Sequence, residues 1–144
     1  MIEQDTIKLL RECDSGIKMG VKSIEDVLDH VKTPSFRQML GACEREHQKL
    51  GEEIYAELRS FQDDGKDPSP IAESMSWIKT EAKLAMNDSE KTVASLMTDG
   101  CDMGTKSLNR YLNQYKAASE RSKDLAKRLI QIEEDLRTGL RQYL

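Results

Sequence analysis

The chain has 144 residues, a length that suits one domain with a single hydrophobic core. Charged residues make up 33% and aromatic residues 5%, with only three prolines, which is typical of helices with solvated faces and predicts an all-α fold. The 26 acidic and 22 basic residues are mixed along the chain, giving a net charge of -4 without a basic stripe, so we expect no nucleic-acid partner.

The sequence also lacks the features of a membrane or secreted protein. No apolar run reaches the length of a membrane span, and the first residues read as amphipathic helix rather than as a leader. Three cysteines, an odd number, stand inside helical patterns, which favours reduced thiols packed in the core over disulfides. We therefore expect a cytoplasmic protein with no membrane partner.

The first predicted helix begins near residue 3, and its inward positions recur at alternating steps of three and four. Pro disfavours helical geometry in the residue before it but fits the first turn of a helix. We therefore predict that this helix ends at Thr33-Pro34 and that Thr33 caps the next one. The predicted stripe consists of Ile7, Leu10, Asp14, Ile17, Val21, Ile24, Leu28 and Val31.

The second predicted helix has the same periodicity and completes a first hairpin over residues 3–62. It ends at residues 63–70, a cluster of turn formers and helix breakers. Its predicted stripe consists of Phe36, Leu40, Cys43, His47, Leu50, Ile54, Leu58 and Phe61.

The remaining chain predicts a crossover over residues 63–87 and a second hairpin over 88–144. The crossover contains a short helix anchored by Trp77, and Asn87 with Glu90 resembles a capping box that opens a third helix to Tyr115. We place the next turn at residues 117–119, because a stripe then runs in phase to the C-terminus through Leu125, Leu129, Ile132, Leu136, Leu140 and Tyr143. Residues 1–144 thus form one four-helix-bundle domain.

An internal repeat links the two hairpins. Residues 16–28 return at 100–112 with a constant offset of 84 (100 minus 16), which indicates a duplicated hairpin. Because Gly inside a helix is unfavourable by roughly 0.5 to 1 kcal/mol relative to Ala, its repetition predicts close helix approach, within the monomer or across a dimer. The recurring residues are Gly16, Met19, Gly20, Lys22, Ser23, Ile24 and Leu28, matched by Gly100, Met103, Gly104, Lys106, Ser107, Leu108 and Leu112.

Two hairpins joined by a long connection, with a Glu-x-x-His on the second helix, resemble the ferritin-like superfamily. Further motifs resemble a small bacterial branch of it near the rubrerythrins, a domain family of unknown function. The resemblance implies a ferritin-like four-helix bundle over nearly the whole chain. The motifs are Asp14-Ser15-Gly16-Ile17-Lys18 with the Lys-Ser-Ile block after it, Glu44-Arg45, Trp77 and Asp99-Gly100.

The dinuclear metal centre of that superfamily takes a carboxylate from each of two helices and a Glu-x-x-His from each of the other two. Glu44 and His47 supply one such pair, since residues three apart share a helix face. The hairpin register places Val21 opposite them, where the resemblance implies a glutamate, and the repeat carries this position to Thr105. Most of the dinuclear pattern is therefore missing.

Two carboxylates complete the candidate metal ligands. Asp14 lies on the first stripe but about one to two turns from His47, and Glu133 is the inward acidic residue of the fourth helix, roughly opposite Cys101. A metal site of iron or manganese would use Glu44, His47, Asp14 and Glu133. Alternatively, His47 is an interior histidine with satisfied hydrogen bonds and Asp14 fixes the helix register, in which case Asp14→Leu raises thermal stability or changes the oligomeric state.

Three functions stay open from the sequence. We rank first a structural or interaction protein, not an enzyme, that needs no cofactor and associates with itself as a dimer or with a protein partner. A metal-binding ferritin-like protein with a partial site is the alternative. A histidine phosphotransfer module is a second alternative, suggested by His47 and Lys49, and it requires a solvent-accessible His47.

Overall fold

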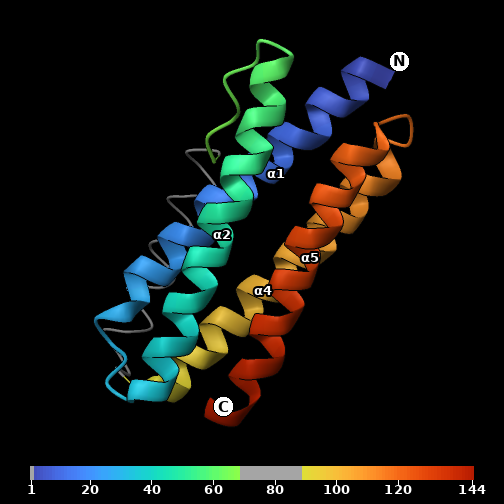
Figure 1. Cartoon of the computed structure of the whole chain (residues 1–144). Helices are drawn as coiled ribbons and strands as arrows, with labels where there is room; N and C mark the ends of the chain where they lie inside the picture. Colours follow the sequence, from blue (N-terminus) through green and yellow to red (C-terminus); the bar gives the residue numbers. More distant parts are fainter. Residues whose placement is uncertain (1, 69–88) are drawn as a thin grey trace.

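The computed structural model describes residues 2–68 and 89–144, which form four α-helices and no strand (Figure 1). The all-α class is thereby confirmed, whereas the expected crossover helix with Trp77, and the capping residue Asn87, lie outside the described residues. The helices are α1 (Ile2–Leu28), α2 (Pro34–Ser60), α4 (Glu90–Gln114) and α5 (Glu120–Leu140), followed by the short 3-10 helix η1 (Arg141–Tyr143).

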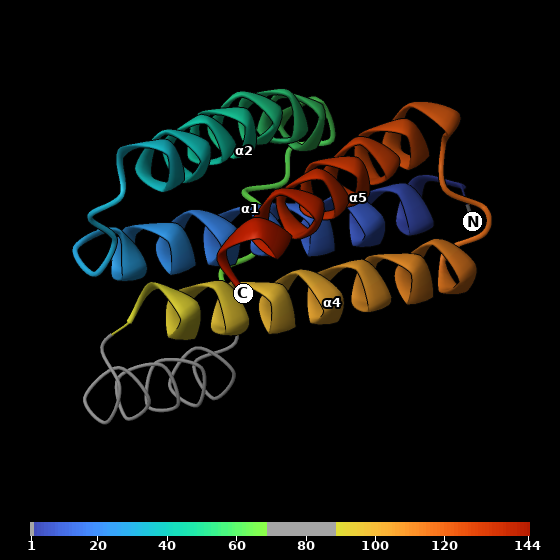
Figure 2. The ribbon, with the colours of Figure 1, turned by 90° about the horizontal axis from the view of Figure 1, so that it is seen from below.

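The helices pair as two antiparallel hairpins. α1 packs mainly against α2 and α4 mainly against α5, and the hairpins meet chiefly where α5 contacts both α2 and α1. In the side view of Figure 2, α2 and α5 form the upper layer, and α1 and α4 lie below them. α2 ends and α4 begins at opposite ends of the bundle, so these two helices run parallel (Figure 1).

Serine side chains begin both helices of the second hairpin. The hydroxyl oxygen of Ser89 accepts a hydrogen bond from the backbone N–H of Thr92, and that of Ser119 accepts one from Ser122, each at 3.2 Å. The predicted turn at residues 117–119 is confirmed, because α5 begins at Glu120. The third helix begins at Glu90 rather than at Asn87.

The end of the first helix was predicted too late. α1 ends at Leu28, not at Thr33, because the chain leaves the helix in a turn closed by a 2.9 Å hydrogen bond from the backbone N–H of His30 to the carbonyl of Val27. Thr33 does occupy the N-cap position of α2, but its side chain makes no cap hydrogen bond. Its hydroxyl donates instead to Glu90 at the start of α4, at 2.6 Å.

The predicted apolar stripes form the core. Every member of the second stripe that lies within α2 is buried, and Leu125, Leu129, Leu136 and Leu140 of the fourth are buried as well. The buried side chains form two apolar clusters, one towards each end of the bundle. Along α2, Cys43 belongs to one cluster and Leu50 to the other, so His47 lies between them.

Candidate functional site

His47 forms the centre of a buried polar group between the two apolar clusters. Its side chain is 1% exposed, and its Nε2 lies 2.8 Å from Oε1 of Glu133 on α5. Its Nδ1 lies 2.8 Å from the carbonyl oxygen of Cys43, one turn earlier on α2. His47 is thus an interior histidine with both ring nitrogens hydrogen-bonded, and its contact with Glu133 joins the two hairpins.

The charge state of His47 follows from these contacts. Burial by itself lowers the pKa of the imidazole, but hydrogen bonds and electrostatic attraction from Cys43 and Glu133 outweigh it and raise the pKa to about 10. The ring is therefore protonated at neutral pH, with Nε2–H donating to Glu133 and Nδ1–H donating to the Cys43 carbonyl. The result is a buried ion pair between α2 and α5.

Two repeated glycines adjoin this ion pair. A methyl group added at Gly20 on α1 would lie 2.7 Å from Nε2 of His47, closer than atoms can approach. One added at Gly104, the matching glycine on α4, would lie 3.6 Å from Oε2 of Glu133, an ordinary contact. The expected close helix approach is therefore present within the monomer at Gly20, where the missing side chain makes room for the imidazole.

Two cysteines complete the polar group. Sγ of Cys43 lies 3.5 Å from Nδ1 of His47. Burial, followed by the carboxylate of Glu133, raises the pKa of Cys101 on α4, which confirms the expectation that these two residues face each other. Cys13 lies about two turns before Gly20 on α1, away from this group, and burial raises its pKa to about 12. All three cysteines are free and buried, as the sequence indicated.

Glu44 lies beside this group but is turned towards α1. Its side chain is partly buried and hydrogen-bonded to Glu25, and burial followed by this contact raises the pKa of Glu44. The carboxyl groups of Glu44 on α2 and Glu25 on α1 therefore lie next to each other at the surface of the first hairpin.

Asp14 is separated from His47 and holds the loop after α2. It is 4% exposed, its Oδ2 accepts a 2.9 Å hydrogen bond from the backbone N–H of Lys66, and the same oxygen lies 2.9 Å from Nζ of Lys18. Because Asp14 pairs with both groups, this geometry argues against the expected rise in stability of Asp14→Leu, which stays a prediction: the variant would remove the acceptor of the partly buried Lys66 N–H.

Further contacts fasten the same loop to α1. Arg11 forms a bidentate hydrogen-bonded ion pair with Asp63, and Lys18 also lies 2.9 Å from Asp67. Gly65 has a φ of +89°, and a side chain there would collide with Asp14. Burial and charge in this region therefore serve to anchor the loop that leaves the first hairpin.

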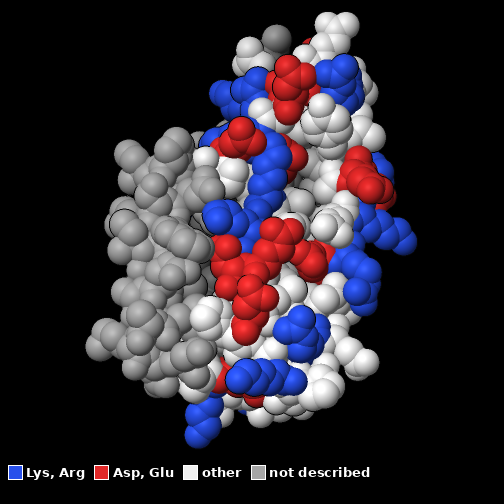
Figure 3. Space-filling model, turned by 90° about the vertical axis from the view of Figure 1, so that its left-hand side faces the viewer, with Lys and Arg blue, Asp and Glu red and all other residues white. Residues whose placement is uncertain are grey.

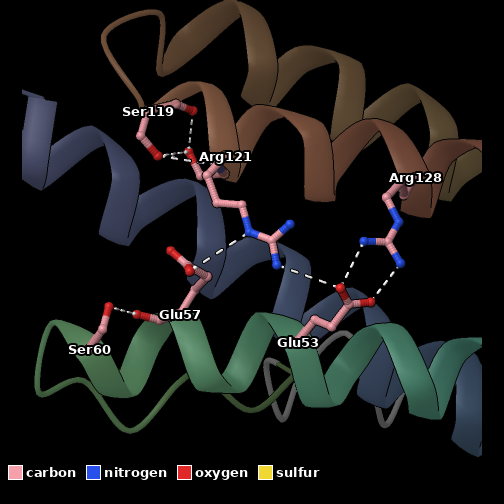
Figure 4. Close-up of polar contacts among 7 residues, drawn as sticks. Glu53, Glu57, Ser60, Ser119, Arg121 and Arg128 are labelled. Carbon is pink, nitrogen blue, oxygen red and sulfur yellow. Dashed lines mark hydrogen bonds and ion pairs between the residues drawn. The ribbon is translucent and has the colours of Figure 1, made fainter.

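Exposed ion pairs reinforce the contact between α2 and α5. Arg128 on α5 forms a bidentate pair with Glu53 on α2, at 3.0 and 2.6 Å, and Arg121 reaches both Glu53 and Glu57 (Figure 4). Figure 3 shows another face of the molecule, where acidic and basic side chains are interspersed and acidic ones gather near the middle. The described residues on that face form no continuous basic stripe.

The four candidate metal ligands are thus only partly brought together. His47 and Glu133 touch, Glu44 faces Glu25, and Asp14 binds the loop. Across residues 2–68 and 89–144, no three His, Cys, Asp or Glu side chains are grouped so that they could hold a metal ion. None of the helices in the same residues is long and apolar enough to cross a membrane.

Comparison of the chain with protein-family models, with curated proteins and with solved structures yields no match. The arrangement of side chains therefore carries the functional argument. Sequence reasoning identified His47 and Glu133 separately but missed their contact, and it treated Cys43 as core packing. The available signal was that Cys43 and His47 stand four residues apart on one helix face.

Proposed function

We propose that the chain is a structural or interaction protein whose bundle is ferritin-like and holds the His47–Glu133 ion pair where a metal centre would otherwise lie. The observation that carries this proposal is that both nitrogens of the His47 ring are already hydrogen-bonded to protein oxygens, each at 2.8 Å. A histidine binds a metal through a nitrogen lone pair, and an imidazolium that donates from both nitrogens has none.

The other donors support the same proposal. Asp14 is occupied by the Lys66 N–H and by Lys18, and Glu44 is paired with Glu25. This leaves one imidazole and one carboxylate at the centre, fewer than the three protein ligands that catalytic metal sites use. A balanced ion pair needs no external charge, so the interior is electrostatically complete without a metal.

The ferritin-like assignment is likewise a proposal. It is supported by the antiparallel pairs α1–α2 and α4–α5, by the parallel course of α2 and α4, and by a central polar layer between two apolar clusters. The levels at which a metal-binding relative would place glutamates are Val21 and Thr105 in this chain, as the sequence indicates. Self-association as a dimer stays a prediction, which sedimentation velocity tests.

Metal analysis combined with NMR tests the proposal. Untagged protein should contain no stoichiometric iron, manganese or zinc, and added Fe²⁺ or Mn²⁺ should leave the thermal midpoint unchanged. The ring ¹⁵N shifts of His47 should show two protonated nitrogens at pH 7. His47→Gln serves as the assignment control, because it removes the signal without adding a ligand.

Metal binding is the second candidate, favoured by one observation: His47 and Glu133, both proposed as ligands from the sequence, are in direct contact. A metal would have to replace the shared proton and separate the two side chains. Stoichiometric metal that is lost in both His47→Gln and Glu133→Gln would establish this candidate and refute the first. The phosphotransfer alternative has no such support, because His47 is buried and could not meet a partner domain.

A further inference from the structure

We propose that Glu90 is an acid-sensitive latch that fastens the start of α4 to the turn between α1 and α2. Oε1 of Glu90 accepts hydrogen bonds from the backbone N–H groups of Lys32 and Thr33, at 2.8 and 2.7 Å. Oε2 accepts a third hydrogen bond from the Thr33 hydroxyl, at 2.6 Å. One carboxylate of the second hairpin thus binds three donors of the first.

The second hairpin contains a matched position that lacks this contact. α4 begins with Ser89 and Glu90 and α5 with Ser119 and Glu120, and each serine accepts the same 3.2 Å hydrogen bond from the backbone N–H three residues later. The Glu120 side chain, however, is 86% exposed and contacts Lys123 within its own helix. An acidic residue in the first turn complements the helix dipole without further partners, so the three hydrogen bonds of Glu90 are an additional feature.

The contact depends on the negative charge of Glu90. An ionised carboxylate only accepts hydrogen bonds, and bonds to a charged acceptor are stronger than neutral ones. The Thr33 hydroxyl, followed by the two backbone N–H groups, therefore lowers the pKa of Glu90 below its ordinary value of 4.5. A carboxyl whose pKa is lowered in the fold contributes fully above the ordinary value, and this contribution is lost as the pH falls through the lowered one.

The groups around Glu90 leave this carboxyl as the titrating member of the contact. Among the described residues, no charged side chain contributes to its pKa shift, and neither the Thr33 hydroxyl nor a backbone N–H titrates in acid. Arg37, in the first turn of α2, is instead hydrogen-bonded to the carbonyl oxygens of Leu28 and Val31, at 2.6 and 2.9 Å. Protonation of Glu90 therefore opens the latch without a second charge change.

An NMR titration of the intact chain from pH ~7 to ~3 tests the latch. The amide proton shifts of Lys32 and Thr33 should move together with the side-chain carboxyl shift of Glu90, at one midpoint below 4.5. Amides in the middle of α2 should keep their shifts through that midpoint, which separates opening of the latch from unfolding of the bundle. Amides of Lys32 and Thr33 that do not titrate, or that change only as the whole chain unfolds, would overturn the proposal.

Glu90→Gln and Glu120→Gln form a matched pair of variants, since glutamine keeps the length of the side chain but removes the charge. In Glu90→Gln the titration of both amides should disappear, and hydrogen exchange of the Thr33 amide at pH ~7 should become at least about tenfold faster. Glu120→Gln should leave both properties unchanged. A titration that persists in Glu90→Gln, or is lost equally in Glu120→Gln, would refute the latch.

Thr33→Val tests the hydroxyl donor while the carboxylate stays in place. Because this variant removes the strongest of the three interactions that lower the pKa of Glu90, the midpoint should rise towards 4.5. The two backbone N–H groups remain, so the amides of Lys32 and residue 33 should still titrate. An unchanged midpoint would refute the three-donor geometry on which the latch rests.

Discussion

The two hairpins share a sequence block but use it differently. In the first, Gly20 allows the imidazole of His47 to lie against α1, so the glycine is a steric requirement. In the second, Gly104 leaves an ordinary 3.6 Å contact to Glu133, and Gly100 adjoins open space. The repeat therefore preserves the glycines, while only Gly20 is required for close packing.

A second pair of positions shows the same difference. The 84-residue offset carries Asp14 to Thr98. Asp14 bonds outside its helix, to the backbone N–H of Lys66, whereas the Thr98 hydroxyl donates within its own helix to the carbonyl of Ala94 at 2.8 Å. At this pair of matching positions, the first hairpin thus has a long-range polar contact and the second a contact within one helix.

The largest effect should come from removing the contribution of the second hairpin to that centre. Glu133→Leu leaves the imidazolium of His47 buried without its counter-charge, and breaking a buried pair in this way costs about 3 to 5 kcal/mol in the free energy of unfolding. Urea denaturation followed by circular dichroism measures it. The double variant His47→Leu, Glu133→Leu should regain most of the loss, because it removes both charges; a double variant as unstable as the single one would contradict the ion-pair description.

The free energy of unfolding should depend on pH because of the His47–Glu133 ion pair. A histidine whose pKa is raised to about 10 in the fold binds its proton more tightly than in the unfolded chain, where it titrates near 6.5. Its contribution is fully present below pH ~6.5 and falls as pH rises towards ~10, by up to about 1.4 kcal/mol per pH unit. The titratable groups that interact with the ring are Glu133 from α5 and Cys43 and Glu44 from α2, and α1 approaches it at Gly20.

Measurements between pH ~6.5 and ~7.5 isolate this effect best, because unfolded thiols, with a pKa of about 8.5, are ionised to no more than about a tenth in that range. The free energy of unfolding should decrease across the window in the wild-type chain. The leucine double variant lacks both titrating groups, so its stability should be nearly constant. Equal slopes for the two proteins would mean that His47 is neutral in the fold.

A steric comparison should give the next largest effect. Gly20→Ala places a methyl group against the His47 ring, which cannot move without losing Glu133, and overpacking of this kind costs about 1 to 3 kcal/mol. Gly104→Ala meets no such obstacle and should be neutral or stabilising by up to about 1 kcal/mol through helix propensity. Thermal denaturation of both variants measures the contrast. Equal destabilisation would mean that the two hairpins pack alike.

Some of these features could be predicted from the sequence and others could not. The α2 stripe was predicted well, because a three-and-four pattern of large apolar residues leaves one inward face. The end of α1 was predicted too late because Val31 continues the three-and-four pattern and is buried. Val31 lies after the end of the helix, however, and its side chain reaches the core from the turn. The contact of His47 with Glu133 could not be predicted, since spacing within one hairpin says nothing of the register between hairpins.

The loop anchor should have a smaller effect than the central pair. Asp14→Leu removes the acceptor of the partly buried Lys66 N–H and one partner of Lys18, and the loss of a hydrogen bond to a charged group costs about 1.5 to 3 kcal/mol. The matched variant in the second hairpin, Thr98→Val, loses only a bond within its own helix and should cost less than about 1 kcal/mol. Urea denaturation compares them. A stabilised Asp14→Leu protein would restore the interpretation of Asp14 as a register-fixing residue.

The smallest effect is expected at the exposed part of the contact between the hairpins. Glu53 joins the same two helices as the His47–Glu133 pair, with contacts of similar length to Arg128, but it is partly exposed, so water screens its charge. Glu53→Gln should therefore shift the urea midpoint far less than Glu133→Leu does. The shift should shrink further in 1 M salt, where the Debye length falls to about 3 Å. A shift as large as that of Glu133→Leu would mean that the surface ion pairs, rather than the buried centre, hold the second hairpin against the first.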